Sequence, residues 1–410
     1  MRILFISTTF PDASSPARGT YNSALCQALS QEHQVRVIAP RAFTEAIPFR
    51  LKRNRYQLPN ELQSSNLAAS YPTFWYTPKA MQEKSGDQMW WSVKSDVQKA
   101  VNEFQPEAVL SYWAHPEGEV GVRAAQLANV PSAVIVGGSD VLILPNLPKR
   151  GPRVRDVLLQ SDTVITVSDG LRNSVIELGA NPDRVQTIYQ GIDPQVFHQH
   201  VSRSDAQQQL KLNSELKHLV WVGRMVPVKA LDVLIDAASD LFNQKLPFEL
   251  HLIGDGPERG RLEMRVEQCG LSDSVRFEGT IGHDQIADWY RAADLTVMSS
   301  DSEGLPNVLR ESLACGTPFV STDVGSISEI ADSRYSQLVP KQNSELLAKA
   351  IVDVLDESFA INARQYQARS WDETALETAS LFERLRSEKS SSRTEASKQN
   401  QPTEIPIASQ

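Results

Sequence analysis

Short runs of aliphatic and β-branched residues alternate with amphipathic stretches from one end of the chain to the other. Apolar runs bounded by turn-forming residues predict buried strands, whereas apolar positions three and four apart predict helices. The strand-like runs occupy residues 3–7, 35–39, 108–112, 133–137, 163–168, 219–223, 249–253, 294–298 and 318–322, and the clearest helical stretches occupy residues 21–31, 93–104, 230–242 and 344–355. This alternation predicts an α/β fold, with parallel sheets covered by helices on both faces.

The alternation breaks once, over residues 191–217, where the chain is polar, rich in glutamine and interrupted by proline. We therefore expect a Rossmann-like domain over residues 1–190, a linker region over 191–217 and a second Rossmann-like domain over 218–370. Residues 371–386 are expected to form a helix that crosses back to the first domain, and residues 387–410 a disordered tail, because they contain almost nothing to bury. Sheets of this kind bind ligands beyond the carboxyl ends of their strands, so the cleft between the two domains is the expected site.

Composition and charge narrow the range of functions. The net charge is −9, from 41 Lys and Arg against 50 Asp and Glu, and this balance is opposite to that of a dedicated nucleic-acid binder. The three cysteines, Cys26, Cys269 and Cys315, lie far apart, which argues against a disulfide framework or a zinc knuckle and for a reducing compartment. No run approaches the ~18 apolar residues of a spanning helix. We expect a cytoplasmic protein, with attachment to the inner face of a membrane left open.

The segment with the most specific chemistry is SDSEGLPNVLRESLACGTP, residues 300–318. Pro306 suits the first turn of a helix, and the amides of Gly304 and Leu305 would lie at its positive end, where hydroxyls and phosphates bind well. Glu303 before this helix and Glu311 within it could accept paired hydrogen bonds from sugar hydroxyls. The spacing alone is equally compatible with a simpler interpretation, in which Glu303 caps the helix and Glu311 is an exposed helical acid.

A second segment supplies positive charge. The predicted strand that ends at Gly223 is followed by Arg224 and Lys229 before a helix. Two fixed cations at such a turn would neutralise the charge that grows on a leaving diphosphate, although a solvated surface pair is the simpler interpretation. The next strand ends in IGDGP, residues 253–257, which lacks the dinucleotide fingerprint and suggests a tight turn that supports a nucleotide pocket.

Motifs that the chain lacks exclude several other classes. There is no G-x-x-x-x-G-K-[ST] of P-loop enzymes, no G-x-S-x-G of a nucleophile elbow, and no D-x-D pair with which many sugar transferases hold a metal. We expect neither a metal nor a cofactor.

The first half offers candidates that would face these segments across the cleft. Arg18 and Gly19 form a turn after the first strand, and the backbone of a glycine turn can approach a ligand closely. His115 lies just beyond a strand end and could donate to substrate or orient an acceptor; a structural or exposed histidine is the commoner case. Asp140, after another strand, could face the cleft or cap the next turn.

Taken together, these segments resemble the retaining glycosyltransferase family 4, whose members have the GT-B fold of two Rossmann-like domains facing across a cleft. The resemblance covers about residues 1–386. Its most specific element is the family's E-x7-E motif, which here comprises Ser300, Glu303, Gly304, Pro306 and Glu311. The G-R-x-x-x-x-K segment and the IGDGP turn support it in family order, as do residues 275–295 and 167–193.

The resemblance implies roles for individual residues. The candidate catalytic residues are Arg224, Lys229, Glu303 and His115, and the candidate donor-binding residues are Gly19, Gly223, Thr280, Ile281, Gly304, Leu305, Pro306 and Glu311. Arg224 and Lys229 would hold the diphosphate, Glu311 the ribose, and Glu303 the transferred sugar. Gly19 would approach the phosphates, the backbone near Thr280 and Ile281 would border the base, and Arg18 and Asp140 would lie on the acceptor side. The chain departs from many members at Arg18-Gly19, where they have Gly-Gly, and at Gln190, where they have Asn.

The resulting hypothesis is retaining transfer of a hexosyl sugar from a UDP- or GDP-linked donor to a glycan or lipid-linked acceptor. The likeness is closest to enzymes of exopolysaccharide or teichuronic-acid type. The alternatives are a sugar-nucleotide epimerase or hydrolase of the same fold and a non-catalytic binder of nucleotide sugars. A basic segment with Arg50, Lys52, Arg53 and Arg55 could contact an anionic membrane, although a solvated loop explains it equally well.

Overall fold

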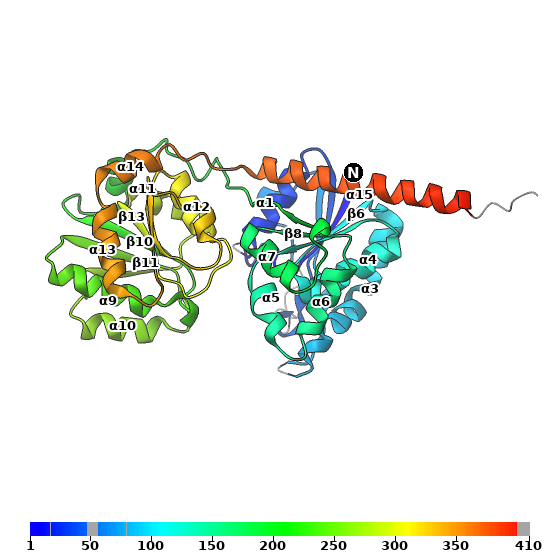
Figure 1. The fold of residues 1–410 in the computed structure, drawn as a ribbon, viewed down its shortest axis with the longest axis horizontal. Coiled ribbons are helices and arrows are strands. Elements are labelled where there is room, and N and C mark those ends of the chain that lie inside the picture. The colour runs from blue at the N-terminus through cyan, green and yellow to red at the C-terminus, as the bar shows by residue number, and fades with distance from the viewer. Residues whose placement is uncertain (17, 47–55, 79, 400–410) are drawn as a thin grey trace, which may run out of the picture.

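The computed structural model describes residues 1–16, 18–46, 56–78 and 80–399. The chain forms two α/β domains that lie side by side (Figure 1). The basic segment with Arg50, Lys52, Arg53 and Arg55 lies outside the described residues. Within the described part of the chain, no helix combines the length and the hydropathy that crossing a bilayer requires.

The N-terminal domain is built on a seven-stranded parallel sheet with the order β4-β2-β1-β6-β7-β8-β9. Its strands are β1 (Arg2–Ile6), β2 (Gln34–Ile38), β4 (Leu67–Ser70), β6 (Ala108–Tyr112), β7 (Ser132–Val136), β8 (Thr163–Thr166) and β9 (Val185–Thr187), and β3 (Arg41–Ala42) and β5 (Thr73–Phe74) pair separately. Its helices are α1 (Thr20–Leu29), α2 (Phe43–Ala46), α3 (Ser85–Phe104), α4 (Glu119–Ala128), α5 (Ser139–Leu142), α6 (Gly151–Gln160) and α7 (Asp169–Glu177), and a single π-helical turn, η4 (Ala114–Gly118), follows β6. The chain order along the sheet reverses between β1 and β6, which is where α/β sheets open a crevice for ligands.

The C-terminal domain repeats this plan with six parallel strands in the order β12-β11-β10-β13-β14-β15. The strands are β10 (Lys217–Val222), β11 (Phe248–Ile253), β12 (Val275–Gly279), β13 (Leu295–Met298), β14 (Phe319–Thr322) and β15 (Ser336–Val339). The helices are α8 (Arg203–Leu210), α9 (Leu231–Asn243), α10 (Arg259–Gln268), α11 (His283–Ala292), α12 (Asn307–Ala314), α13 (Ser344–Val354) and α14 (Glu357–Ala363). Here the reversal falls between β10 and β13. The two parallel-sheet domains confirm the predicted fold class.

Each domain has its own hydrophobic core, and the runs that predict strands form the centre of each. Phe5, Leu110 and Ile135 are buried in the first domain, and Trp221 and Leu252 in the second. Strands buried on both faces read as continuous apolar runs, which explains why the central strands were evident from the sequence.

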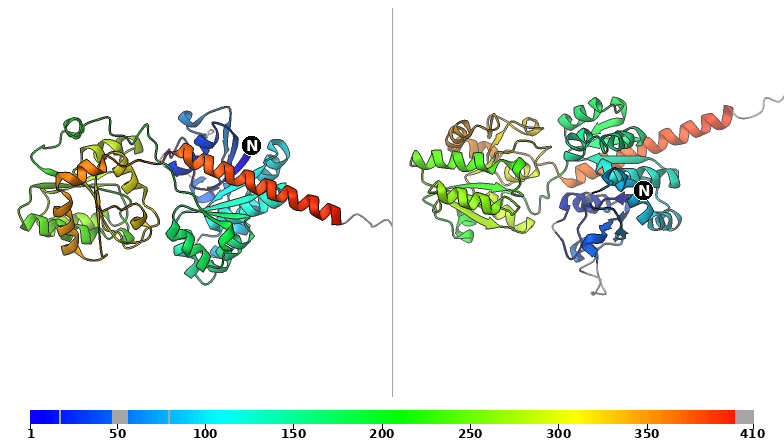
Figure 2. Two further views of the ribbon diagram at one scale, coloured as in Figure 1. Left: turned by 45° about the horizontal axis from the view of Figure 1, so that its top comes forward. Right: turned by 90° about the horizontal axis from the view of Figure 1, so that it is seen from below.

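The long helix α15 (Trp371–Gln399) begins between the domains and runs along the N-terminal domain (Figure 2). Ala375, Ala379 and Phe382 of this helix belong to the N-terminal core, as expected for a helix that crosses back. The prediction of a disordered tail is wrong for residues 387–399, which continue α15. Nothing between 387 and 399 breaks a helix, since the first proline after Trp371 is Pro402.

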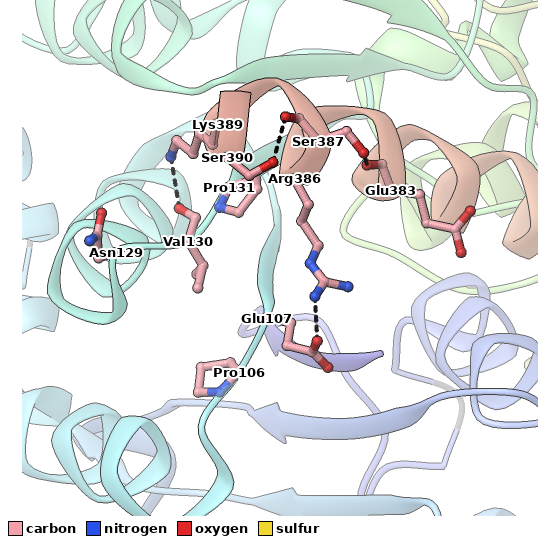
Figure 3. A pocket seen from close by; sticks show the side chains of 10 residues that line it. All are labelled: Pro106, Glu107, Asn129, Val130, Pro131, Glu383, Arg386, Ser387, Lys389 and Ser390. Carbon is pink, nitrogen blue, oxygen red and sulfur yellow. Dashed lines mark hydrogen bonds and ion pairs between the residues drawn. The ribbon is translucent and has the colours of Figure 1, made fainter. Parts of the chain in front are cut away.

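Polar contacts also hold the part of α15 around Arg386 and Lys389 against the N-terminal domain, at a groove shown in Figure 3. Arg386 pairs with Glu107 at 2.5 Å, and the Lys389 ammonium donates to the Val130 carbonyl at 3.0 Å. These contacts explain why the helix persists beyond its last buried residues.

The linker region is smaller than the sequence predicts. The ring of Phe197 packs against Tyr290, and the Gln207 side chain of α8 donates to the Ala292 carbonyl at 2.9 Å. Residues from Phe197 onward therefore belong to the C-terminal domain. The polar appearance of the segment reflects its position on the outer face of α11 rather than a link between domains.

Candidate functional site

The strongest candidate pair meets where the chain order of the C-terminal sheet reverses. Lys229 follows β10 and Glu303 follows β13, and these two strands are neighbours in the sheet. The Lys229 ammonium lies 2.5 Å from the Glu303 carboxylate, and both side chains are largely shielded from water, with 22% and 11% of their surface exposed. The sequence placed both residues beyond strand ends, and the fold brings them into direct contact at the crevice where such sheets bind ligands.

Close backbone packing positions the loop that carries Gly223 and Arg224. Gly254, with a φ of 133°, adopts a conformation that suits only glycine, and an added Cβ would overlap the carbonyl oxygen of Gly223. The Met225 amide donates to the Asp255 carbonyl at 2.9 Å. The IGDGP segment is thus a tight turn beneath the Arg224 loop, as predicted. The side chain of Arg224 is exposed at the mouth of this loop.

Helix α12 carries Glu311, the second acid of the predicted motif. Pro306 directly precedes its first residue, which confirms the predicted start, and Gly316, with a φ of 80°, follows its end. Glu311 is 8% exposed and accepts a hydrogen bond from the Tyr290 hydroxyl at 3.3 Å. Burial, with the nearby carboxylate of Glu311, raises the pKa of that hydroxyl well above its ordinary value. The alternative of an exposed helical acid is therefore wrong for Glu311.

Glu311 also lines a pocket to which both domains contribute. The lining residues include Thr20 and Tyr21 from α1 of the N-terminal domain, together with Asn307 and Trp371. Figure 1 shows α12 on the side of its domain that faces the N-terminal domain. The motif acid is thus accessible to a ligand that spans the junction.

A second interdomain contact forms around Gly304. An ideal Cβ on Gly304 would lie 2.9 Å from the carbonyl oxygen of Gly137, and one on Gly138 would lie 3.7 Å from the Gly304 Cα. Gly137 follows β7, so loops at the carboxyl ends of both sheets approach each other here. Leu305 and Pro306, which follow Gly304, are buried.

Asp140 is fully buried, and its carboxylate accepts from the amides of Ala114 at 3.2 Å, Gly137 at 3.2 Å and Gly138 at 2.9 Å. Burial raises the pKa of Asp140 although these amides favour the charged form. The side chain therefore ties two strand-end loops together, and its position matches a loop cap better than a group facing the cleft.

His115 lies in the interior and not at the surface of the cleft. Its Nδ1 lies 2.8 Å from Glu119, and its Nε2 lies 2.9 Å from the Ser85 hydroxyl. Glu119 also pairs with Arg153 at 2.7 Å. With both ring nitrogens engaged and no exposed surface, the side chain of His115 is oriented by its own domain.

The turn at Arg18 and Gly19 has the predicted backbone geometry, but the Arg18 side chain forms an ion pair within its own domain. Gly19 has a φ of 63°, and an added Cβ would overlap the Thr9 carbonyl, so glycine is required there. Arg18 pairs with Glu45 at 2.9 Å.

Thr280 and Ile281 lie in the loop between β12 and α11, at the carboxyl edge of the sheet. Thr280 is exposed, and Ile281 is partly packed against the core. The contact with a nucleotide base stays a prediction for both.

Sequence reasoning missed a loop that joins the two domains. Gly325, with a φ of 60°, packs on the Glu303 carbonyl, and the Ser326 amide donates to the Gly304 carbonyl at 3.0 Å. The Glu329 carboxylate, from the same domain, accepts from the Gly170 amide at 2.7 Å. A glycine and small polar residues directly after the predicted strand 318–322 were the available signal.

A buried acid on the N-terminal side was also missed. Glu117 is 2% exposed and accepts a hydrogen bond from the Thr8 hydroxyl, and its second carboxylate oxygen has no partner among the residues that the structure describes. Burial raises its pKa. Thr8 follows β1 and Glu117 follows β6, so this contact spans the order reversal of the N-terminal sheet.

Two facing Rossmann-like domains with motif residues at both order reversals define the architecture of a GT-B glycosyltransferase. The most similar folds include a sucrose-phosphate synthase from Thermosynechococcus elongatus, with a TM-score of 0.78 and 21% identity over 94% of this chain and 99% of that one. Anabaena HepE, solved in complex with UDP, has a TM-score of 0.73 at 19% identity over 94% of this chain and all of its own.

The chain belongs to glycosyltransferase family 4. The model described as Glycosyltransferase Family 4 matches residues 19–196, and that described as Glycosyl transferases group 1 matches residues 216–357. A D-inositol 3-phosphate glycosyltransferase of Jonesia denitrificans is 30% identical over 67% of this chain and 70% of its own length.

Two further relatives differ in how much of their length is matched. D-inositol 3-phosphate glycosyltransferase 2 of Catenulispora acidiphila is 32% identical, and the match spans 63% of this chain and 63% of that protein. The Bacillus subtilis teichuronic acid biosynthesis glycosyltransferase TuaC is 26% identical over 86% of this chain and 88% of its own length.

Proposed function

We propose that the protein is a retaining glycosyltransferase that moves a hexosyl sugar from a nucleoside-diphosphate sugar to a hydroxyl of a glycan or lipid-linked acceptor. The observation that carries the proposal is the Lys229–Glu303 pair, which bridges the loops after β10 and β13 at the crevice of the C-terminal sheet. A cation and a carboxylate held side by side suit a ligand that has a diphosphate next to a sugar.

The proposed donor lies along the carboxyl edge of the C-terminal sheet. Arg224 and Lys229 neutralise the diphosphate, and the Glu303 carboxylate binds hydroxyls of the transferred sugar. Glu311 binds the ribose in the pocket that it shares with α1. The base then lies against Thr280 and Ile281, and the turn at Gly19 approaches the phosphates from the other domain. UDP is the first donor nucleotide to test, because the similar fold of HepE was solved with it, and GDP is the second.

The proposed reaction replaces one bond to the anomeric carbon with another on the same face. The bond between this carbon and the diphosphate oxygen breaks, and the acceptor oxygen bonds to the carbon. The acceptor proton passes to the departing phosphate oxygen, so the transfer needs no carboxylate base. Arg224 and Lys229 would lie beside the oxygens on which negative charge grows, so they would lower the barrier to bond cleavage and supply the charge that a metal would otherwise provide.

The acceptor belongs to the N-terminal side. The buried carboxylate of Glu117, one oxygen of which has no partner within the described part of the chain, lies at the order reversal of that sheet, near the loops of His115 and Asp140. Similarity to TuaC, whose name places it in teichuronic acid biosynthesis, supports a cell-envelope glycan as the acceptor class. Contact of the basic segment with an anionic membrane would fit a lipid-linked acceptor.

The proposal is tested by measuring sugar transfer after a thermal-shift screen of UDP, GDP and their sugar conjugates. Lys229→Ala and Glu303→Gln should each lower kcat by roughly 10²–10³-fold. Lys349→Ala, which removes an exposed lysine from α13 of the same domain, should match the wild type.

Two results would contradict the proposal. Near-normal transfer by Lys229→Ala would show that the site assignment is wrong. Conversion of the donor at the same rate with and without acceptor would indicate a hydrolase or epimerase, and nucleotide-sugar binding without turnover would indicate a non-catalytic relative. Anomeric configuration of the product, read by NMR, tests retention.

A further inference from the structure

A cluster of ionisable side chains lies on one face of the C-terminal sheet, away from the candidate catalytic residues. In the parallel register, His218 of β10 is opposite Glu249 of β11, so the two side chains share a face. His251 lies two residues after Glu249 and therefore projects from the same face, as does its partner Arg276 on β12. Glu278 lies at a bulge in β12, and its contact with His251 at 2.8 Å places it on this face too. Such a group is unusual on the buried face of a parallel sheet.

The hydrogen bonds of the two histidines fix which nitrogens carry protons. His218 Nε2 lies 3.0 Å from the Asn213 carbonyl oxygen, which can only accept, so this nitrogen donates. His251 Nδ1 lies 2.8 Å from the Glu278 carboxylate and also donates. In two neutral rings, the remaining nitrogens, His218 Nδ1 and His251 Nε2, therefore both present lone pairs.

These two lone pairs face each other at 3.1 Å, in the interior of the domain. His218 is fully buried and His251 is 1% exposed, and a separation of 3.1 Å leaves no room for a water molecule between the two nitrogens. Two acceptors at this distance repel each other unless positive charge lies between them. A cation that both nitrogens coordinate removes the repulsion and satisfies both.

The carboxylate of Glu249 is a third candidate ligand beside the two histidine nitrogens. Glu249 Oε2 lies 3.9 Å from His218 Nδ1 and 4.0 Å from His251 Nε2. These three ligand atoms lie within 4.8 Å of one another. Ligands about 2.0–2.1 Å from a tetrahedral zinc ion are separated by about 3.3 Å, so a small rotation of the Glu249 side chain would close the triangle.

We propose that His218, Glu249 and His251 bind one first-row divalent transition metal ion, with Zn²⁺ the best match to two imidazoles and a carboxylate. The neighbours orient these ligands as metal sites require, because Glu278 holds His251 through its far nitrogen and Arg276 binds the other Glu249 oxygen at 3.1 Å. Hard ions such as Mg²⁺ prefer oxygen ligands and are a poor match.

The metal would stabilise the domain and take no part in the transfer. His218 and Glu249 are the second residues of their strands, whereas Arg224 and Lys229 follow the carboxyl end of β10. The ring of His251 also packs against Trp289 of α11, with ring centroids 4.9 Å apart. The ion would therefore join β10 and β11 and anchor the helix packed over them.

The test uses the full-length chain, purified without chelator and analysed for metal by mass spectrometry. We expect about one ion per chain and, after chelation, rebinding of Zn²⁺ with a Kd on the order of a micromolar or below. Rebinding should raise Tm, because an ion that binds only the folded state stabilises it. Co²⁺ in its place should give the intense visible bands of tetrahedral coordination.

Two variants and one control test the ligand set. Glu249→Gln removes the charge of a ligand and should weaken Zn²⁺ binding. Glu278→Gln leaves all three ligands in place but removes the group that orients His251, and it should weaken Zn²⁺ binding by about 10–100-fold. Glu278→Gln keeps the test valid if ligand variants do not fold. His200→Ala is the control, because His198 and His200 stack near the surface and could collect zinc.

Two outcomes would overturn the proposal. One is a protein that contains less than about 0.1 ion per chain and binds no Zn²⁺ below about 10 µM, in which case a shared proton bridges the two rings. The other is binding that disappears in His200→Ala and persists in Glu249→Gln. Neither outcome bears on the proposed transfer reaction, which is assayed separately.

Discussion

Gly170 offers a way to separate the two domains without touching a candidate catalytic residue. It is the second residue of α7 in the N-terminal domain, and its amide donates to Glu329 of the C-terminal domain at 2.7 Å. A Cβ at this position would overlap Ser326 Oγ and lie 3.4 Å from Glu329 Oε1. Both atoms belong to the other domain, so Gly170→Ala acts directly on the domain junction.

The expected effects on the helix and on the junction have opposite signs. Alanine is favoured over glycine in a helix by about 1 kcal/mol, so α7 itself should gain stability. At the junction, the overlap with Ser326 is closer by about 1 Å than an ordinary carbon–oxygen contact, and relieving it loosens the hydrogen bonds of Glu329. Bonds to a carboxylate contribute about 1.5–3 kcal/mol, reduced by partial exposure, so the closed arrangement should lose about 2 kcal/mol, or roughly 30-fold in population.

Solution scattering and donor kinetics measure this loss. Gly170→Ala should raise the radius of gyration and raise KM by roughly 10–30-fold, with Tm unchanged or higher. Ser326→Ala in the same chain should restore most of both, because it removes the overlapping hydroxyl and leaves a Cβ at 3.6 Å, although it also removes the bond to Ser168. Gly260→Ala is the matched control, since Gly260 is the second residue of α10 and has open space around it. Wild-type scattering and KM in Gly170→Ala would refute the reasoning.

Three further predictions concern other contacts. Glu329→Ala should open the domains as Gly170→Ala does, and Glu329→Gln should have an intermediate effect. Scattering by both Glu329 variants equal to that of the wild type would contradict this. Gly254→Ala should lower Tm and transfer together, because a Cβ collides with the backbone of Gly223; calorimetry and kinetics of one preparation check it. Asp12→Asn should destabilise the chain by about 3 kcal/mol near pH 7, because it leaves the buried Arg41 charge unpaired, and urea unfolding measures the loss. Burial alone would raise the pKa of Asp12, but bonds from Ser14 and Arg41 lower it below its ordinary value. The stabilisation of the folded state by Asp12 is therefore present above about pH 4 and is lost as the pH falls further. A difference in stability between variant and wild type that persisted at pH 2 would be contrary to this.

The strands that the sequence predicted are those buried on both faces. Apolar runs revealed β1, β6 and β7, whereas the edge strands β4, β9, β12 and β15 were missed. Edge strands have neighbours on one side only, and their composition is mixed; Val275–Gly279, for example, contains Arg276 and Glu278. The extension of α15 was missed for a related reason, because the helix is held beyond its last buried residues by polar contacts of Arg386 and Lys389, which hydrophobic patterning does not detect.

The residues of the candidate site that belong to short sequence motifs could be predicted from the sequence. Lys229 and Glu303 are 74 positions apart, but each follows a recognisable strand, and parallel strands bring such positions to one edge. Burial of His115 and Asp140 was not predictable, since it depends on how neighbouring loops close over them. The His218–His251 pair was equally hidden, because it depends on the register between strands and not on any local spacing.

The two halves of the candidate site are held in different ways, and this difference bears on how substrates enter. Within the C-terminal domain, backbone packs on backbone at Gly254 and Gly325, and the Asp301 amide donates to the Val228 carbonyl at 2.8 Å, so the loops of Arg224 and Glu303 are joined to each other. Across the junction, polar groups are joined by hydrogen bonds, as in the bond of 2.8 Å between Ser326 and Ser168. Polar interfaces of this kind permit relative domain motion. The donor loops should therefore move as one rigid unit, and opening the junction would admit substrates without dismantling the Lys229–Glu303 pair.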